Sequence, residues 1–151
     1  MRPGVRLGVD VGRVRVGVAR SDRDGLLATP VETIQRDGLD GLVARVRELA
    51  TEVDAVELVV GLPLSLSGGD TASTQDARDV AAALAAVAPV RLVDERLSTV
   101  TAQAGMRLAG RSTRRQKGVI DQAAAVVILQ HALDAERGGR LPGMMVDHEE
   151  V

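Results

Sequence analysis

Three acidic residues mark the positions at which this chain could do chemistry: Asp10, Glu95 and Asp121. Each lies where an apolar run meets the end of an expected element, and a carboxylate there is costly unless a positive group shares its site. Carboxylates that are brought together repel each other unless one is protonated or a cation neutralises them. Hard divalent ions such as Mg²⁺ or Mn²⁺ prefer oxygen ligands. The three acids are therefore candidate ligands of such an ion, in an arrangement typical of metal-assisted phosphodiester hydrolysis.

Asp10 lies in the run Gly8-Val9-Asp10-Val11-Gly12, which we expect to form a strand. Strand alternation puts Asp10 on the same face as Gly8 and Gly12. Because neither glycine has a side chain, a metal ion or a ligand has room to approach. An Asp that serves a turn near a hairpin is the simpler interpretation. We favour function, because an Asp inside an apolar strand is rarely without a role.

Asp121 and Glu95 are weaker candidates when each is taken alone. Asp121 is in helical phase with Ala125 and Leu129, so it lies on the stripe expected to pack against the sheet. Acid in the first turn of a helix is also favourable by itself, and the residues leave these two interpretations equal. Glu95 follows an expected strand, at the end where open α/β sheets place ligands. For Glu95 alone, a solvated turn acid is the simpler interpretation.

A basic segment without acidic residues precedes Asp121. Its members are Arg107, Arg111, Arg114, Arg115 and Lys117. A run of charges is more often a solvated face, but the closeness of residues 111–117 to Asp121 favours a clamp for substrate phosphates at the mouth of the site. The net charge of −2 argues against a general nucleic-acid binder, so we expect a local grip on phosphates.

The elements that must position these residues predict an α/β fold. The expected strands cover 5–11, 15–20, 26–34, 56–61 and 90–93, and the expected helices cover 39–51, about 71–87, 98–109 and 118–137. The first two strands form a hairpin, and Pro30 indicates a sheet edge. Asp70 or Thr71 is expected to cap the second helix. The pattern predicts a mixed five-stranded sheet, an antiparallel meander plus parallel strands, flanked by helices.

Composition limits the function classes. With 151 residues, 45% of them hydrophobic, we expect one domain over 1–137 and a disordered acidic tail over 138–151. The chain has no aromatic residues, so bases cannot stack on Phe, Tyr or Trp. It has no Cys, which excludes disulfides, thiolate metal sites and a Cys nucleophile. We find neither a signal peptide nor an apolar run that could span a bilayer, and expect a cytoplasmic protein.

The loop after the fourth strand has two interpretations. Gly61-Leu62-Pro63, followed by Gly68-Gly69, could bring backbone N–H groups to a phosphate. It could equally be an ordinary connection between a strand and a helix.

Four motifs, in this order and spacing, resemble the YqgF family, also called RuvX, of Holliday junction resolvases or pre-16S ribosomal RNA nucleases. They are Gly8-Val9-Asp10-Val11-Gly12 with Arg15-Val16-Gly17-Val18-Ala19, Gly61-Leu62-Pro63, Asp94-Glu95-Arg96-Leu97-Ser98-Thr99, and Lys117-Gly118-Val119-Ile120-Asp121 with Ala124-Ala125 and Ile128-Leu129-Gln130. The resemblance extends to about Asp134. Ala132 departs from the family pattern, because similar chains often carry an aromatic residue at this position. This difference concerns the packing of the core and not the site.

The resemblance implies a ribonuclease-H-like fold in which Asp10, Glu95 and Asp121 are the metal-binding catalytic acids. We expect Asp10 to bridge two Mg²⁺ or Mn²⁺ ions about 3.5–4 Å apart, one activating water and the other stabilising the leaving oxygen. Glu95 and Asp121 are expected to complete the coordination. Arg15, on the facing strand, is expected to contact the substrate phosphate or the carboxylates, and Gly17 to allow the backbone to approach closely.

The expected function is a metal-dependent nuclease that processes the 5′ end of pre-16S ribosomal RNA in ribosome biogenesis, with structured RNA as its partner. The alternative is a Holliday junction resolvase acting on branched DNA, which needs two opposed sites in a dimer. We favour RNA because the basic segment is short, and leave monomer or homodimer open. A non-catalytic nucleic-acid-binding module for ribosome assembly is a third interpretation. An ATPase of the actin and sugar-kinase type needs a second domain, for which 151 residues leave no room.

Overall fold

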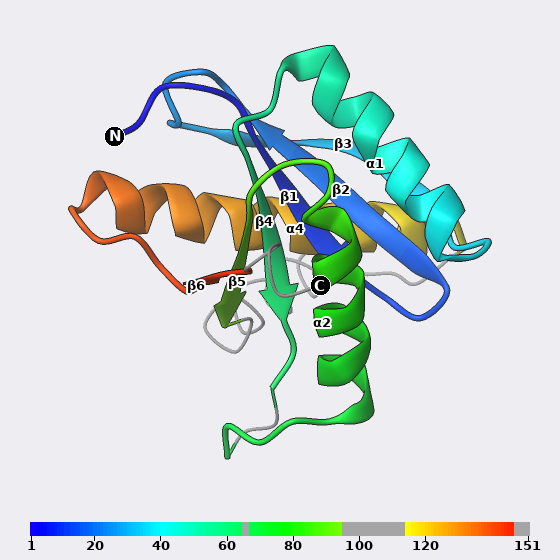
Figure 1. Cartoon of the computed structure of the whole chain (residues 1–151). Coiled ribbons are helices and arrows are strands. Elements are labelled where there is room, and N and C mark those ends of the chain that lie inside the picture. Colours follow the sequence, from blue (N-terminus) through cyan, green and yellow to red (C-terminus); the bar gives the residue numbers. More distant parts are fainter. Residues whose placement is uncertain (65–66, 95–113, 147–151) are drawn as a thin grey trace.

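Within the described residues, six strands form one mixed sheet in the order β3-β2-β1-β4-β5-β6 (Figure 1). The computed structural model describes residues 1–64, 67–94 and 114–146, and describes 114–121 by their backbone alone. The strands are β1 Arg6–Val11, β2 Arg15–Ser21, β3 Ala28–Gln35, β4 Glu57–Leu62, β5 Val90–Asp94 and β6 Met144–Met145. The described helices are α1 Leu39–Val53, α2 Ala72–Leu84 and α4 Arg114–Arg137. β2 lies antiparallel between β1 and β3, whereas β1, β4 and β5 run parallel.

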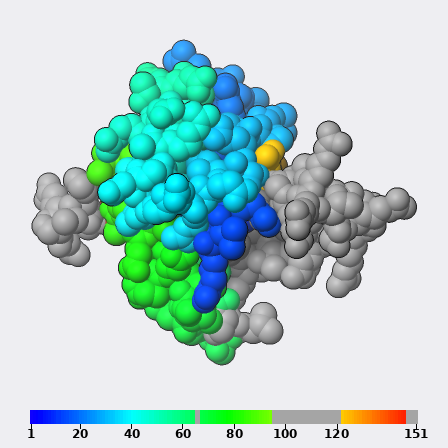
Figure 2. Space-filling model, turned by 90° about the vertical axis from the view of Figure 1, so that its right-hand side faces the viewer, coloured from blue at the N-terminus to red at the C-terminus, as the bar shows by residue number. Residues whose placement is uncertain are grey.

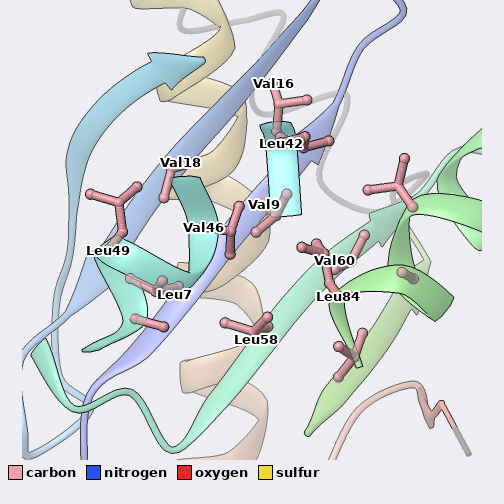
Figure 3. Packing of buried hydrophobic residues seen from close by; sticks show 14 of the residues in the cluster. Leu7, Val9, Val16, Val18, Leu42, Val46, Leu49, Leu58, Val60 and Leu84 are labelled. Carbon is pink, nitrogen blue, oxygen red and sulfur yellow. The ribbon is translucent and has the colours of Figure 1, made fainter. Parts of the chain in front are cut away.

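Helices cover both faces of the sheet, with α1 and α2 on one face and α4 on the other (Figure 1). Alternation along β1 divides its residues between them. Leu7 and Val9 are buried with Leu42 and Val46 of α1 (Figure 3). The second apolar cluster joins the opposite face to α4 and consists of Ala19, Ala28, Val59, Val93, Ala125, Ile128, Leu129, Ala132 and Leu133. No helix in the described part of the chain is both long and apolar enough to cross a membrane.

A group of charged residues joins the amino-terminal segment and the end of α4 to the sheet. Arg6, which is 2% exposed, pairs with Glu136 near the end of α4 at 2.7 Å (Nη2 to Oε2). Arg2 also pairs with Glu136, and its Nη1 lies 3.2 Å from Oε2 of Glu57. Arg91 of β5 completes the group, with its Nε 3.3 Å from Oε1 of Glu57. This group lies at the amino-terminal end of β1 and β4, opposite to the end that carries Asp10.

The predicted mixed sheet flanked by helices is confirmed, and all five expected strands are present. Pro30 lies in β3, which forms an edge of the sheet as expected. Thr71 caps α2 in a capping box, because the backbone N–H of Thr74 donates to its hydroxyl and the Thr71 N–H donates to the Thr74 hydroxyl. α2 ends at Leu84, three residues before its expected end.

The strand β6 is an addition that we did not expect. Met144–Met145 pairs with β5 through Arg91 and Leu92, inside the segment 138–151 for which we predicted disorder. Residues 147–151 lie outside the described residues, as does the helix predicted over 98–109.

The predicted helix over 118–137 leaves Arg114, Arg115 and Lys117 before its start. This part of the prediction is wrong, because α4 begins four residues earlier and contains all three. Arg, Gln and Lys are good helix formers, and the helix continues through Gly118, which we took as its start. Asp121 therefore lies seven residues after the first residue of α4. Because the helix macrodipole acts within the first turn, pairing with it does not explain this acid.

Candidate active site

Asp10, Gly17 and Thr33 form a row across the first three strands. Asp10 of β1 lies opposite Gly17 of β2, and Gly17 lies opposite Thr33 of β3. Directly paired residues of antiparallel strands project from the same face, here the face covered by α4. Asp10 and Thr33 are both half-buried. Gly17, between these two residues, contributes no side chain to the row.

The part of α4 around Gln122 lies over this row. The Gln122 side-chain amide donates to the Thr33 hydroxyl at 3.1 Å. In Figure 2 the first residues of α4 whose side chains are described, in amber, lie against the light blue of the β3 region. One turn further along the helix, Ala125 contacts Gly8, two residues before Asp10 on the same face of β1. Four residues of a helix and two residues of a strand each extend about 6–7 Å. Asp121 precedes Ala125 by four residues, and Asp10 follows Gly8 by two, so the backbone of Asp121 lies at the level of Asp10.

Arg15 lies at the same end of the sheet as Asp10. It is half-buried and precedes Gly17 by two residues in β2, so it belongs to the face that carries Asp10. The turn between β1 and β2 is fixed from the other side of the sheet. The Arg36 guanidinium donates to the Gly12 carbonyl at 2.9 Å and to both carboxylate oxygens of Asp76 in α2, at 2.7 and 3.1 Å. The Asp76 hydrogen bonds raise the pKa of Arg36 above its usual value and outweigh burial, which acts in the opposite direction.

The carboxyl ends of β1, β4 and β5 meet at one edge of the sheet, because these strands are parallel neighbours. Glu95 directly follows β5 but lies outside the described residues, as does Arg111. Asp94, the last residue of β5, alternates to the face of α1 and α2, since Val93 belongs to the α4 cluster. The structure thus brings the end of β5 to the edge that holds Asp10, and the position of Glu95 itself stays a prediction.

Asp10 is the candidate metal ligand whose side chain is described, and its carboxylate oxygens suit a hard divalent ion. No three carboxylate, His or Cys side chains gather as a metal site in the described ranges, which contain neither Glu95 nor the side chain of Asp121. Gly17, which has no side chain, pairs with Asp10 across β1 and β2. The chemistry of Asp10 therefore fits a divalent ion, and completion of its coordination by the other two acids stays a prediction.

The loop after β4 is held to α2 by a side chain. Thr74 donates its hydroxyl to the Pro63 carbonyl, so this carbonyl belongs to the cap of α2. Gly68 has a φ of 88°, in the region that favours glycine. These contacts fix the described part of the loop between β4 and α2, and the phosphate-binding interpretation stays a prediction.

The family comparison agrees with this arrangement. The model of the family described as "RuvX: Holliday junction resolvase" matches residues 4–135. The chain belongs to the RuvX family. The Clavibacter michiganensis subsp. michiganensis protein named "Putative pre-16S rRNA nuclease" is 59% identical over 155 residues, covering 100% of this chain and 96% of the relative. A Streptomyces coelicolor protein of the same name is 50% identical, covering 97% of this chain and 90% of the relative.

Two solved structures share the fold. RuvC of Thermus thermophilus in complex with a Holliday junction substrate has a TM-score of 0.60 and is 18% identical. The match covers 92% of this RuvX chain and 99% of the RuvC chain. A second Thermus thermophilus RuvC structure has a TM-score of 0.53 and is 20% identical. This match covers 91% of this RuvX chain and 99% of the RuvC chain. At these identities the likeness concerns the fold, and it confirms the expected ribonuclease-H-like class.

Sequence reasoning missed Thr33 and Gln122. Thr33 is one polar residue of an edge strand, and Gln122 is one of several polar residues around α4. Their separation of 89 positions gives no local pattern that would join them. Adjacency to Asp121 was the one available signal for Gln122.

Proposed function

We propose that this RuvX chain is a divalent-metal-dependent nuclease that processes the 5′ end of pre-16S ribosomal RNA. Asp10, Glu95 and Asp121 are its metal-binding and catalytic residues. The observation that carries this proposal is the row of Asp10, Gly17 and Thr33, covered by the part of α4 that contains Asp121. The names of its relatives support the RNA substrate.

The proposed site residues would divide the work between holding the ion and holding the substrate. Asp10 would bind Mg²⁺ or Mn²⁺, which supplies a metal-activated water and stabilises the leaving oxygen. Gly17 would let the nucleic-acid backbone approach Asp10 without a steric clash. Arg15, on the same face, would contact the phosphate next to the scissile bond. Arg111, Arg114, Arg115 and Lys117 would hold phosphates further along the strand.

Parallel cleavage assays test this function. Purified protein with Mn²⁺ should trim or nick a pre-16S RNA 5′ fragment, and Asp10→Asn should abolish cleavage while keeping the circular dichroism spectrum. Asp24→Asn, which alters an exposed Asp in the loop between β2 and β3, is the matched control and should cleave like the wild type. Full cleavage by Asp10→Asn would refute the proposal. RNA binding without cleavage by any metal-loaded form would instead favour the non-catalytic assembly module.

Cleavage of four-way DNA junctions is the second candidate, because the family model carries the name Holliday junction resolvase. This activity requires two active sites on opposed strands and so a two-fold dimer. A junction substrate should be included in the same assay, together with a measurement of mass in solution. Paired symmetric nicks from a dimer, with the RNA left intact, would transfer the assignment to the junction.

A further inference from the structure

Two glutamines of α4 bind the edge strand β3 and its entry at different levels of the sheet. Gln122 donates to the Thr33 hydroxyl. Gln130 accepts from the Ala28 N–H at 2.9 Å and donates to the Leu26 carbonyl at 3.0 Å. The two glutamines are eight residues apart, which corresponds to about 12 Å along a helix. Gln122 is therefore at the level of Asp10, whereas Gln130 binds near the opposite end of the sheet.

Asp121 directly precedes Gln122, the first residue of α4 whose side chain is described. Among the side chains described for α4, burial in the apolar cluster begins at Ala125. Residues 122–124, which precede it, are half-buried. Asp121 lies one turn before Ala125, the first of these buried residues in the part of α4 with described side chains. Apolar contacts are non-directional, whereas a hydrogen bond fixes both the distance and the angle between its partners.

We propose that Gln122 is a positioning residue for the metal site: its hydrogen bond to Thr33 holds the segment of α4 that carries Asp121 over the row of Asp10. The bond joins the residue next to Asp121 to the residue that shares a row with Asp10, across Gly17. Loss of the bond would let this part of the helix shift relative to β1 without unfolding the apolar interface behind it. The inference rests on the proposed metal-dependent function.

Mn²⁺ titration calorimetry on the apo protein tests the inference, together with kcat and KM for the cleaved substrate. Gln122→Ala and Thr33→Val each remove the bond, and each should weaken Mn²⁺ binding and lower kcat by about tenfold, as groups that orient a metal ligand do. The KM for the nucleic acid should stay close to the wild-type value. The double variant should lose no more than either single variant, because both act through one contact. Thr33→Ser, which keeps the hydroxyl, should restore most of the Mn²⁺ affinity.

Gln130→Ala is the matched control. It also removes the hydrogen bonds of a glutamine on α4, but these bonds lie far from Asp10. It should lower the melting temperature but leave the Mn²⁺ affinity unchanged. Equal loss of Mn²⁺ affinity in Gln130→Ala and Gln122→Ala would overturn the inference in favour of general destabilisation. Because Gln122→Ala and Thr33→Val break the same bond, either decides the question if the other does not fold.

The Asp10→Asn variant separates the two proposals. Loss of Mn²⁺ binding and cleavage in Asp10→Asn, with wild-type values in both Gln122→Ala and Thr33→Val, would overturn the positioning role alone. Unchanged Mn²⁺ binding and cleavage in Asp10→Asn would overturn the proposed function, and the positioning role with it.

Discussion

Gly8 of β1 lies directly beneath Leu129 of α4. A Cβ atom on Gly8 would be 2.7 Å from the Leu129 Cβ and 2.9 Å from the Ala125 carbonyl oxygen. The helix therefore packs against bare backbone, two residues before Asp10. This close approach sets the height of α4 above the sheet.

Replacement of Gly8 by Ala should push α4 away from the sheet. We expect Gly8→Ala to lower the free energy of unfolding by about 1–3 kcal/mol, as overpacking does, measured by urea denaturation. Gly41→Ala is the control, because Gly41 lies in the exposed part of α1 with nothing within 4 Å of an added Cβ. That variant should be about 0.5–1 kcal/mol more stable than the wild type. A Gly8→Ala protein of wild-type stability would show that the helix can move without cost.

The three acids should act as one unit. Asp10→Asn, Glu95→Gln and Asp121→Asn should each reduce turnover by several orders of magnitude, measured at saturating Mn²⁺. Without metal these variants should be as stable as the wild type or slightly more stable, because each removes like-charge repulsion from the cluster. Thermal melts of the apo proteins check this second expectation. Near wild-type turnover in any two variants would remove the cluster from the mechanism.

The basic residues at the start of α4 should supply affinity that does not depend on sequence. Replacement of both Arg114 and Arg115 by Ala should weaken binding to all nucleic acids tested. The slope of log K against log salt concentration should become shallower by about one to two units, since two phosphate contacts are lost. Filter binding or fluorescence anisotropy at several salt concentrations measures the slope. An unchanged slope would place these residues away from the substrate phosphates.

Stability should fall in acid through Glu136. Burial by itself raises the pKa of Glu136, but hydrogen bonds from Arg2 and the charges of Arg6 and Arg2 outweigh it, so the pKa is lowered on folding. A lowered pKa stabilises the fold above the pKa of the unfolded state, and this contribution is lost as the pH falls through the folded pKa. At neutral pH, Glu136→Gln should be less stable than the wild type by about 1.5–3 kcal/mol, as for a hydrogen bond between charged groups.

Urea denaturation between neutral pH and about pH 3 checks the sign of this effect. The difference between wild type and Glu136→Gln should shrink as the pH falls below the ordinary pKa of a Glu, about 4.3. Glu52→Gln, at the exposed carboxyl-terminal part of α1, is the control and should follow the wild type at every pH. A difference that stays constant over this range would show that the charge of Glu136 adds nothing to folding.

The sequence determined the features that depend on neighbours in the chain. Alternation in β1 separated Leu7 and Val9 from Gly8 and Asp10, and the structure buries the first pair against α1 while the second pair faces α4. Pro30 indicated the sheet edge, because a residue without an N–H is poorly suited to a central strand. Such features follow from backbone geometry within a few residues, so they can be read locally.

Only the tertiary structure decided which distant residues meet. The start of α4 at Arg114 brought Asp121 out of the first helical turn, although Gly118 had indicated a later start. The contact between Thr33 and Gln122 spans 89 positions, and the pairing of β6 with β5 joins Arg91 to Met145, which are 54 positions apart. Contacts of this kind depend on how the sheet and helices pack together, and packing is only weakly encoded in any short stretch of chain. The sequence by itself thus named Asp10 and its face of the strand, and the fold supplied the residues around it.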